Sequence, residues 1–164
     1  MPCENNRLHL IVSSVALTLM CLSGCVEVGV KHDRIPNASF ADFVPVIFKQ
    51  AHPRNDGPFD ASDGDEPELF SSIMDENLRL IKAQPKRRVR VIGSTDDSEC
   101  VARECIYLSA RRALVIEEWL IVRGVARSRF DPIMLLGENY PASENNGEDG
   151  RRRNRRAEIG FSSE

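Results

Sequence analysis

Two cysteines in one short segment, Cys100 and Cys105, are the residues whose type and spacing most directly suggest chemistry. Such a pair can form a redox centre, contribute to a metal site or close a structural disulfide. A zinc site would need two further ligands, and His32 and His52 lie far away in low-complexity surroundings. The sequence therefore favours a structural disulfide, and it predicts no metal and no other cofactor.

Charged side chains are concentrated in two segments: residues 56–68 are acidic, and residues 151–156 include five arginines. The acidic segment could imitate a paired-carboxylate site, but it is rich in Asp, Gly and Pro, which predicts a loop without rigid support. The sequence contains neither a Gly-x-Ser-x-Gly motif nor a pairing of a nucleophile with a base. We therefore expect a protein that is not an enzyme.

The composition is that of one soluble domain together with a targeting segment. The chain has 164 residues, of which 41% are hydrophobic and 29% charged, enough to bury a core. Its formal net charge of -3 argues against a nucleic-acid partner, because proteins that bind nucleic acid usually carry a basic excess.

The N-terminal residues have the pattern of a secretory signal. Arg7 lies in a short polar start, and an apolar run follows over residues 8–22, shorter than the roughly 20 apolar residues that a spanning helix needs. The run ends in Leu22-Ser23-Gly24-Cys25, which resembles the lipobox of bacterial lipoproteins. In that motif the signal is cut before the cysteine and the thiol is lipidated, so the resemblance implies that Cys25 carries lipid, including palmitate.

The lipobox predicts the segments into which the chain is divided and the cellular location of the protein. We expect a signal peptide at residues 1–24, a tether at residues 25–42 and a folded domain at residues 43–164. Val26, rather than an aspartate, follows the cysteine, which resembles sorting to the outer membrane with the domain facing the periplasm. Cys3 and Cys21 leave with the signal, so Cys100 and Cys105 form an even pair in a compartment where disulfides persist.

Local patterns predict the first half of the folded domain. Residues 43–49 are expected to form a strand, which Pro45 restricts to a sheet edge or a bulge. A helix follows, with Asp65 as its cap and Pro67 in its first turn, and it ends at Pro85. Residues 88–92 alternate as a half-buried strand does and lead directly into Gly93.

The second half of the domain begins with a helix expected over residues 102–123, with Gly124 as its C-terminal cap. This helix is apolar nearly all round, which indicates either packing on two sides or a surface for a partner, and Trp119 is interpreted as core rather than as a platform for sugar stacking. Residues 133–136 and 157–161 predict two further strands. The order predicts an α+β two-layer sandwich, β-α-β-α-β-β, with helices on one face of a mixed sheet.

Several motifs follow one another in a fixed order. They are Val91-Ile92-Gly93-Ser94-Thr95-Asp96, Leu108-Ser109-Ala110-Arg111-Arg112-Ala113, Gly137-Glu138-Asn139-Tyr140-Pro141 and Gly150-Arg151-Arg152-Arg153-Asn154-Arg155-Arg156-Ala157-Glu158-Ile159. This ordered set resembles the OmpA-like C-terminal domain that is shared with the peptidoglycan-associated lipoproteins, and the resemblance covers residues 88–161.

The resemblance implies noncovalent binding of diaminopimelate in the stem peptide of peptidoglycan. By this resemblance, Asp96 binds the ammonium of the amino-acid head, Arg112 binds its carboxylate, and Arg155 is an accessory contact. Thr95, in the same turn as Asp96, belongs to the expected ligand set. The chemistry suits a zwitterion, because arginine offers a carboxylate paired donors where lysine offers a point charge.

The sequence departs from the family in the loop after Asp96. This loop is one residue longer than usual, so Asp97 is a rival for the ligand role, and the usual Tyr-Asn pair is replaced by Cys105-Ile106-Tyr107. A Cys100–Cys105 disulfide would compensate by pinning the turn to the helix start. Alternatives remain for the charged residues: Asp96 as a turn residue, Arg112 as a surface arginine, and residues 151–153 as a solvated tail or a patch for anionic lipid.

These patterns predict a lipoprotein that tethers the outer membrane to peptidoglycan, with other envelope proteins as possible further partners. The alternative is an adaptor of an envelope or secretion complex that keeps the fold and has lost peptidoglycan binding. Binding of diaminopimelate or of intact sacculi would distinguish the two.

Overall fold

The computed structural model describes residues 42–58 and 60–162 of the chain. The expected signal peptide, Cys25 and the tether up to residue 41 lie outside the described residues. The elements follow one another as β1 (Val46–Ile47), α1 (Pro67–Ala83), β2 (Val89–Ser94), α2 (Arg103–Val122), β3 (Met134–Gly137), α3 (Glu148–Asn154) and β4 (Arg156–Phe161), with short 3-10 helices at Ala61–Asp63 and Arg127–Arg129.

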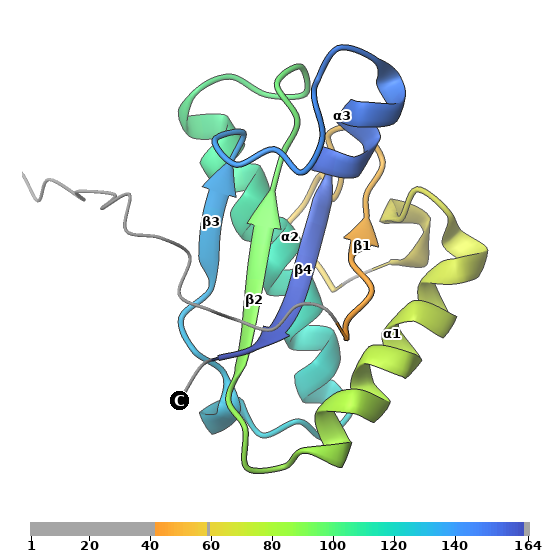
Figure 1. Cartoon of the computed structure of the whole chain (residues 1–164), viewed down its shortest axis with the longest axis vertical. Coiled ribbons are helices and arrows are strands. Elements are labelled where there is room, and N and C mark those ends of the chain that lie inside the picture. Colours follow the sequence, from red (N-terminus) through yellow and green to blue (C-terminus); the bar gives the residue numbers. More distant parts are fainter. Residues whose placement is uncertain (1–41, 59, 163–164) are drawn as a thin grey trace, which may run out of the picture. The chain divides into compact units, whose positions relative to one another are not determined.

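In the described part of the chain, the strands form a four-stranded mixed sheet in the order β1-β4-β2-β3. β2 pairs in parallel with β3, and β4 lies antiparallel between β1 and β2. α2 covers one face of this sheet, and α1 runs beside β1 (Figure 1). The core joins both helices to the sheet through buried side chains that include Phe70, Met74, Val91, Ile116 and Ile159. The expected α+β arrangement is confirmed.

Three local features differ from the sequence prediction. α3, at one end of the sheet, was not expected. β1 is only two residues long, although it lies at the sheet edge, as Pro45 predicts. The predicted cap of α1 was wrong: Glu66 occupies the N-cap position without a side-chain cap bond, and Asp65 instead forms an ion pair with Arg152 of α3.

α2 is buried on two sides over most of its length, which explains why its sequence is apolar nearly all round. Leu120 has no exposed surface, and Val115, which lies five positions earlier and therefore on a different side of the helix, is also buried. Trp119 is half-buried and meets Phe70 of α1 edge to face, with ring centroids 6.3 Å apart. The core interpretation of Trp119 therefore fits its position, whereas Val122 at the helix end is 82% exposed.

The helix ends follow local rules. α1 starts at Pro67 and stops before Pro85, because proline fits a first turn but cannot continue a helix. α2 is followed by Gly124 at a φ of 96°, a conformation that glycine adopts without the strain of a side chain. Within the described residues, no helix is both long and apolar enough to cross a membrane.

Candidate functional site

The site is positioned by a close approach between the end of β2 and α2. A Cβ atom added to Gly93 would lie 1.8 Å from the carbonyl oxygen of Ser109, so only glycine allows the strand to lie this close to the helix. Arg112 follows Ser109 by one helical turn and therefore lies on the same side of α2. Its Nη1 donates to the carbonyl oxygen of Ser94, the last residue of β2, at 2.8 Å.

The Arg112 guanidinium is fully buried, and all of its N–H groups have acceptors inside the protein. Besides Ser94, backbone carbonyl oxygens of His52 and Lys49 accept from Nε and Nη2 at 2.9 and 3.3 Å. The two remaining donors hold the Glu99 carboxylate at 2.6 and 2.7 Å. Burial lowers the pKa of Arg112, and the Glu99 carboxylate opposes that effect. The interpretation of Arg112 as a surface arginine is therefore wrong.

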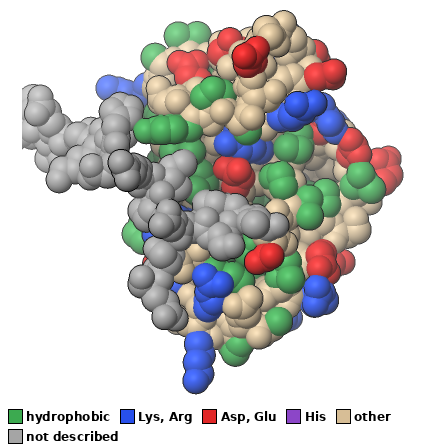
Figure 2. Space-filling view, viewed as in Figure 1, with side chains coloured by type: hydrophobic (Ala, Val, Ile, Leu, Met, Phe, Trp, Pro, Cys, Tyr) green, Lys and Arg blue, Asp and Glu red, His purple; other side chains and the backbone are tan. Residues whose placement is uncertain are grey.

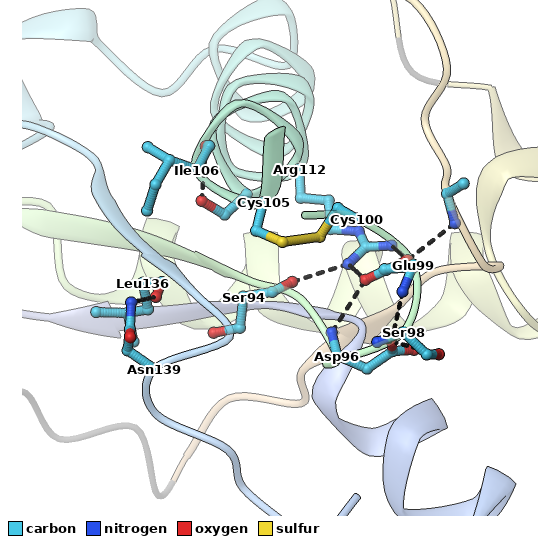
Figure 3. Close-up of a disulfide and its surroundings, with 12 residues drawn as sticks. Ser94, Asp96, Ser98, Glu99, Cys100, Cys105, Ile106, Arg112, Leu136 and Asn139 are labelled. Atoms are coloured by element: carbon cyan, nitrogen blue, oxygen red, sulfur yellow. Dashed lines mark hydrogen bonds and ion pairs between the residues drawn. A yellow bond between two sulfur atoms is a disulfide. The ribbon is translucent and has the colours of Figure 1, made fainter. Parts of the chain in front are cut away.

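Glu99 is the partner of Arg112 that sequence reasoning missed. Both side chains have no exposed surface, and the carboxylate faces the guanidinium fork directly (Figure 3). The backbone N–H of Asp96 donates to Glu99 Oε1 at 3.1 Å, and that of Ala51 donates to Oε2 at 2.8 Å. Each carboxylate oxygen thus accepts two hydrogen bonds, which compensates for burying the charge.

Asp96 lies in the same cluster, whereas Asp97 does not. Asp96 is fully buried, and Asp97 is exposed. Asp96 Oδ1 accepts from the backbone N–H groups of Ser98 and Glu99, so this side chain also closes the turn, as the alternative reading anticipated. Burial acts to raise the pKa of Asp96, but hydrogen bonds from Ser98 and Arg155 outweigh it and lower that pKa.

Arg155 connects Asp96 to α3. Its Nη1 donates to Asp96 Oδ2 at 3.0 Å, and its Nη2 donates to Glu148 Oε1 at 2.6 Å. Burial alone would lower the pKa of Arg155, but the two carboxylates outweigh it and raise that pKa. The structure thus brings Asp96, Arg112 and Arg155 into one cluster, in which Glu99 contacts Arg112 and the backbone of Asp96, and Asp96 contacts Arg155.

Two hydroxyl groups border the cluster without a partner. Ser94 Oγ and Thr95 Oγ1 are buried and have no hydrogen-bond partner among the described residues. The backbone N–H of Thr95 donates to the carbonyl oxygen of Gly137 at 2.8 Å, which fixes the turn against β3. These hydroxyls could therefore still donate to a ligand that reaches the turn.

The Cys100–Cys105 disulfide is present, with Cα atoms 5.1 Å apart, and it ties the loop after Asp96 to the first turn of α2 (Figure 3). Glu99 lies between the turn closed by Asp96 and this disulfide. Both sides of Glu99 are therefore restrained, which reduces the conformational entropy lost when its carboxylate binds Arg112.

A surface cavity of about 290 Å³ lies next to this loop. Glu99 and Cys100 line one part of it, and the charged residues Glu104 and Arg111 of α2 line another. Arg112 does not line the cavity, whereas Glu99 does, although the Glu99 side chain has no exposed surface. In the described residues, no group of three or more His, Cys, Asp or Glu side chains is placed to hold a metal ion.

The arginine-rich segment is folded rather than a solvated tail. Residues 151–153 belong to α3, where Arg152 forms ion pairs with Asp65 and Glu66, and Arg153 is exposed. Figure 2 shows basic and acidic side chains interspersed over the displayed face instead of one continuous basic surface.

Glu99 carried one signal that sequence reasoning did not use. It is a carboxylate directly before Cys100, in the loop between Asp96 and α2. Glu148, the second partner of Arg155, gave no such signal, because the two residues lie at opposite ends of α3, a helix that the sequence did not predict.

The chain belongs to the OmpA family, which matches residues 70–155, about half of the sequence. Among curated proteins, it is 35% identical over 92 residues to the peptidoglycan-binding protein ArfA of Mycobacterium tuberculosis. That match covers 56% of this chain but 26% of ArfA, so the chain spans about a quarter of the length of these relatives. Family membership agrees with the expectation that the domain is not an enzyme.

Solved structures show the same fold. The peptidoglycan-associated lipoprotein from Burkholderia pseudomallei is 20% identical with a TM-score of 0.57, and the match covers 72% of this chain and 89% of that one. The C-terminal domain of Helicobacter pylori MotB is 25% identical with a TM-score of 0.58, covering 74% and 87% respectively. The cell wall anchor of the T6SS from Pseudomonas aeruginosa is also 25% identical, with a TM-score of 0.51, covering 63% and 72%.

Proposed function

We propose that this chain is an outer-membrane lipoprotein whose domain binds the diaminopimelate of peptidoglycan stem peptides and so tethers the membrane to the cell wall. The observation that carries the proposal is the convergence of Asp96, Arg112 and Arg155 in one buried cluster at the end of β2. The similarity to a peptidoglycan-binding protein supports it. The proposed activity consists of binding and release, and no covalent bond is made or broken.

The cluster offers complementary charges to an amino-acid zwitterion. Arg112 would bind the carboxylate through its guanidinium fork, and Asp96 would accept from the ammonium, with Arg155 fixing the Asp96 carboxylate in place. Thr95 would donate its unpartnered hydroxyl. Each charge-assisted hydrogen bond contributes about 1.5–3 kcal/mol net. Asp97 is the rival candidate for the ammonium-binding role, and its exposed position disfavours it.

The membrane half of the proposal rests on the N-terminal sequence. Residues 1–24 would be removed as a signal peptide, Cys25 would be lipidated, and residues 25–42 would span the distance to the domain at residues 43–164. Stable anchoring needs more than one acyl chain, which a triacylated cysteine would supply. Because the second attachment is intramolecular, a modest affinity for the cell wall would be enough to hold both layers together.

Sedimentation with purified sacculi tests the proposal. The full chain in mild detergent should pellet with sacculi, and Asp96→Asn should remain in the supernatant, because loss of one member of a buried charge pair costs about 2–5 kcal/mol of binding. Asp97→Asn removes the same charge from an exposed neighbouring position and is the matched control. Loss of binding in Asp97→Asn alone would transfer the role to Asp97.

A folded wild-type chain that never pellets would support the second candidate, an adaptor of an envelope or secretion complex. One observation favours that alternative: every N–H group of Arg112 already has an acceptor within the protein. Circular dichroism of each variant would separate loss of binding from loss of fold.

A further inference from the structure

The Glu99 carboxylate has the surroundings of a bound ligand. Two guanidinium N–H groups of Arg112 reach it at 2.6 and 2.7 Å, and the backbone N–H groups of Asp96 and Ala51 reach it at 3.1 and 2.8 Å. The two side chains have no exposed surface. An arginine fork with two backbone donors is the arrangement that recognises a free carboxylate.

We propose that Glu99 is an internal ligand: its side chain fills the carboxylate position of the Arg112 site, and a stem-peptide carboxylate binds only after Glu99 moves out. The identity of that external ligand rests on the proposed function. The occupation of the site by Glu99 rests on the contacts of Glu99 alone.

The structure provides a way for the exchange to occur. Glu99 lines the cavity of about 290 Å³, although its side chain has no exposed surface, so a change of side-chain rotamer toward the cavity would release its carboxylate from Arg112 while the disulfide at Cys100 restrains the backbone of the loop. Arg112 is paired with a carboxylate both before and after the exchange, and the unpaired guanidinium occurs only in the minor conformation between them, because a buried and unpaired charge is the state that costs most.

The displacement of Glu99 limits the affinity of the wild-type protein for diaminopimelate. A ligand that binds only one conformation has its affinity reduced by the fraction of that conformation. Minor states of this kind are populated at about 0.1–10%. Removing the Glu99 carboxylate should therefore raise the affinity for diaminopimelate by about tenfold or more.

The test compares the full chain in mild detergent as wild type, Glu99→Gln, Glu99→Ala and Glu104→Gln. Glu99→Gln keeps the size of the side chain and so supplies folded protein if Glu99→Ala does not fold. Glu104→Gln removes a carboxylate from the same cavity without touching Arg112 and is the matched control. Binding of diaminopimelate is measured by calorimetry, and thermal stability is measured in acetate and in chloride at equal ionic strength.

We expect tighter binding of diaminopimelate by both Glu99 variants and unchanged binding by the control. Acetate should stabilise Glu99→Ala, or allow it to fold, and should leave the wild type unchanged. If the wild type binds and the Glu99 variants bind no more tightly, the internal-ligand proposal is wrong and the proposed function stands. If acetate rescues Glu99→Ala but no form binds diaminopimelate or sacculi, the internal ligand stands and the proposed function fails. Absence of both effects overturns both.

Discussion

A double-mutant cycle on the buried pair tests the reading of the site most directly. Arg112→Met leaves the Glu99 carboxylate buried without its counter-charge, which costs about 3–5 kcal/mol of unfolding free energy. It also removes the donors to three carbonyl oxygens, those of Lys49, His52 and Ser94. Since small domains have about 5–15 kcal/mol in total, this variant should be close to the limit of folding.

Glu99→Leu should be destabilising for the reciprocal reason, because it leaves the guanidinium buried and partly unpaired. The double variant Arg112→Met/Glu99→Leu should be less destabilised than the sum of the two, because neither charge is then stranded. With a urea m-value of about 2 kcal/mol/M, a loss of 4 kcal/mol lowers the midpoint by about 2 M. Urea unfolding of the oxidised protein, followed by circular dichroism, measures all four corners of the cycle.

The matched control is the exposed pair Glu76–Arg79 on α1, whose side chains are 47% and 66% exposed. Its coupling should be no more than about 0.5 kcal/mol, because solvent screens an i,i+3 surface pair. If Arg112→Met and Glu99→Leu are additive within about 0.5 kcal/mol, the two residues do not act as a buried pair and the reasoning about this site is refuted.

Three further outcomes are expected. Thiol titration of the denatured, unreduced protein should find Cys100 and Cys105 blocked, and two free thiols at these positions would contradict the disulfide. Replacing both cysteines by serine should lower the unfolding free energy by about 2 kcal/mol, because closing so small a loop removes only this much entropy from the unfolded chain. Asp96→Asn should destabilise the domain at neutral pH, and its urea midpoint should converge with that of the wild type as pH falls below 3.8. The reason is that the lowered pKa of Asp96 stabilises the folded state until the carboxylate is protonated. A difference in urea midpoint that does not change with pH would contradict the lowered pKa. Gly93→Ala should unfold at clearly lower urea than the wild type, by about 1–3 kcal/mol or more, since its Cβ would overlap the Ser109 carbonyl, and an unchanged midpoint would mean that β2 and α2 are not in close contact.

The sequence alone determined the features that depend on neighbours along the chain. Pro67, Pro85 and Gly124 fix helix ends through their own backbone restrictions, so α1 and α2 were located within a few residues. The ordered motifs indicated the family and brought Asp96 and Arg112 forward as candidates before any contact was known. α3 escaped notice because ion pairs to Asp65 and Glu66, rather than an apolar periodicity, hold it in place.

Only the tertiary structure decided which groups meet. Asp96 and Asp97 are adjacent, and it is the path of the turn beyond β2 that buries the first and exposes the second. Glu99 meets Arg112 across 13 residues, and Arg112 meets the carbonyl of His52 across 60. Such contacts depend on how the loop, the helix and the distant segment pack together, and no local propensity specifies that register. The sequence identified Arg112 as a candidate, and the fold determined that the carboxylate of Glu99 already occupies its guanidinium fork.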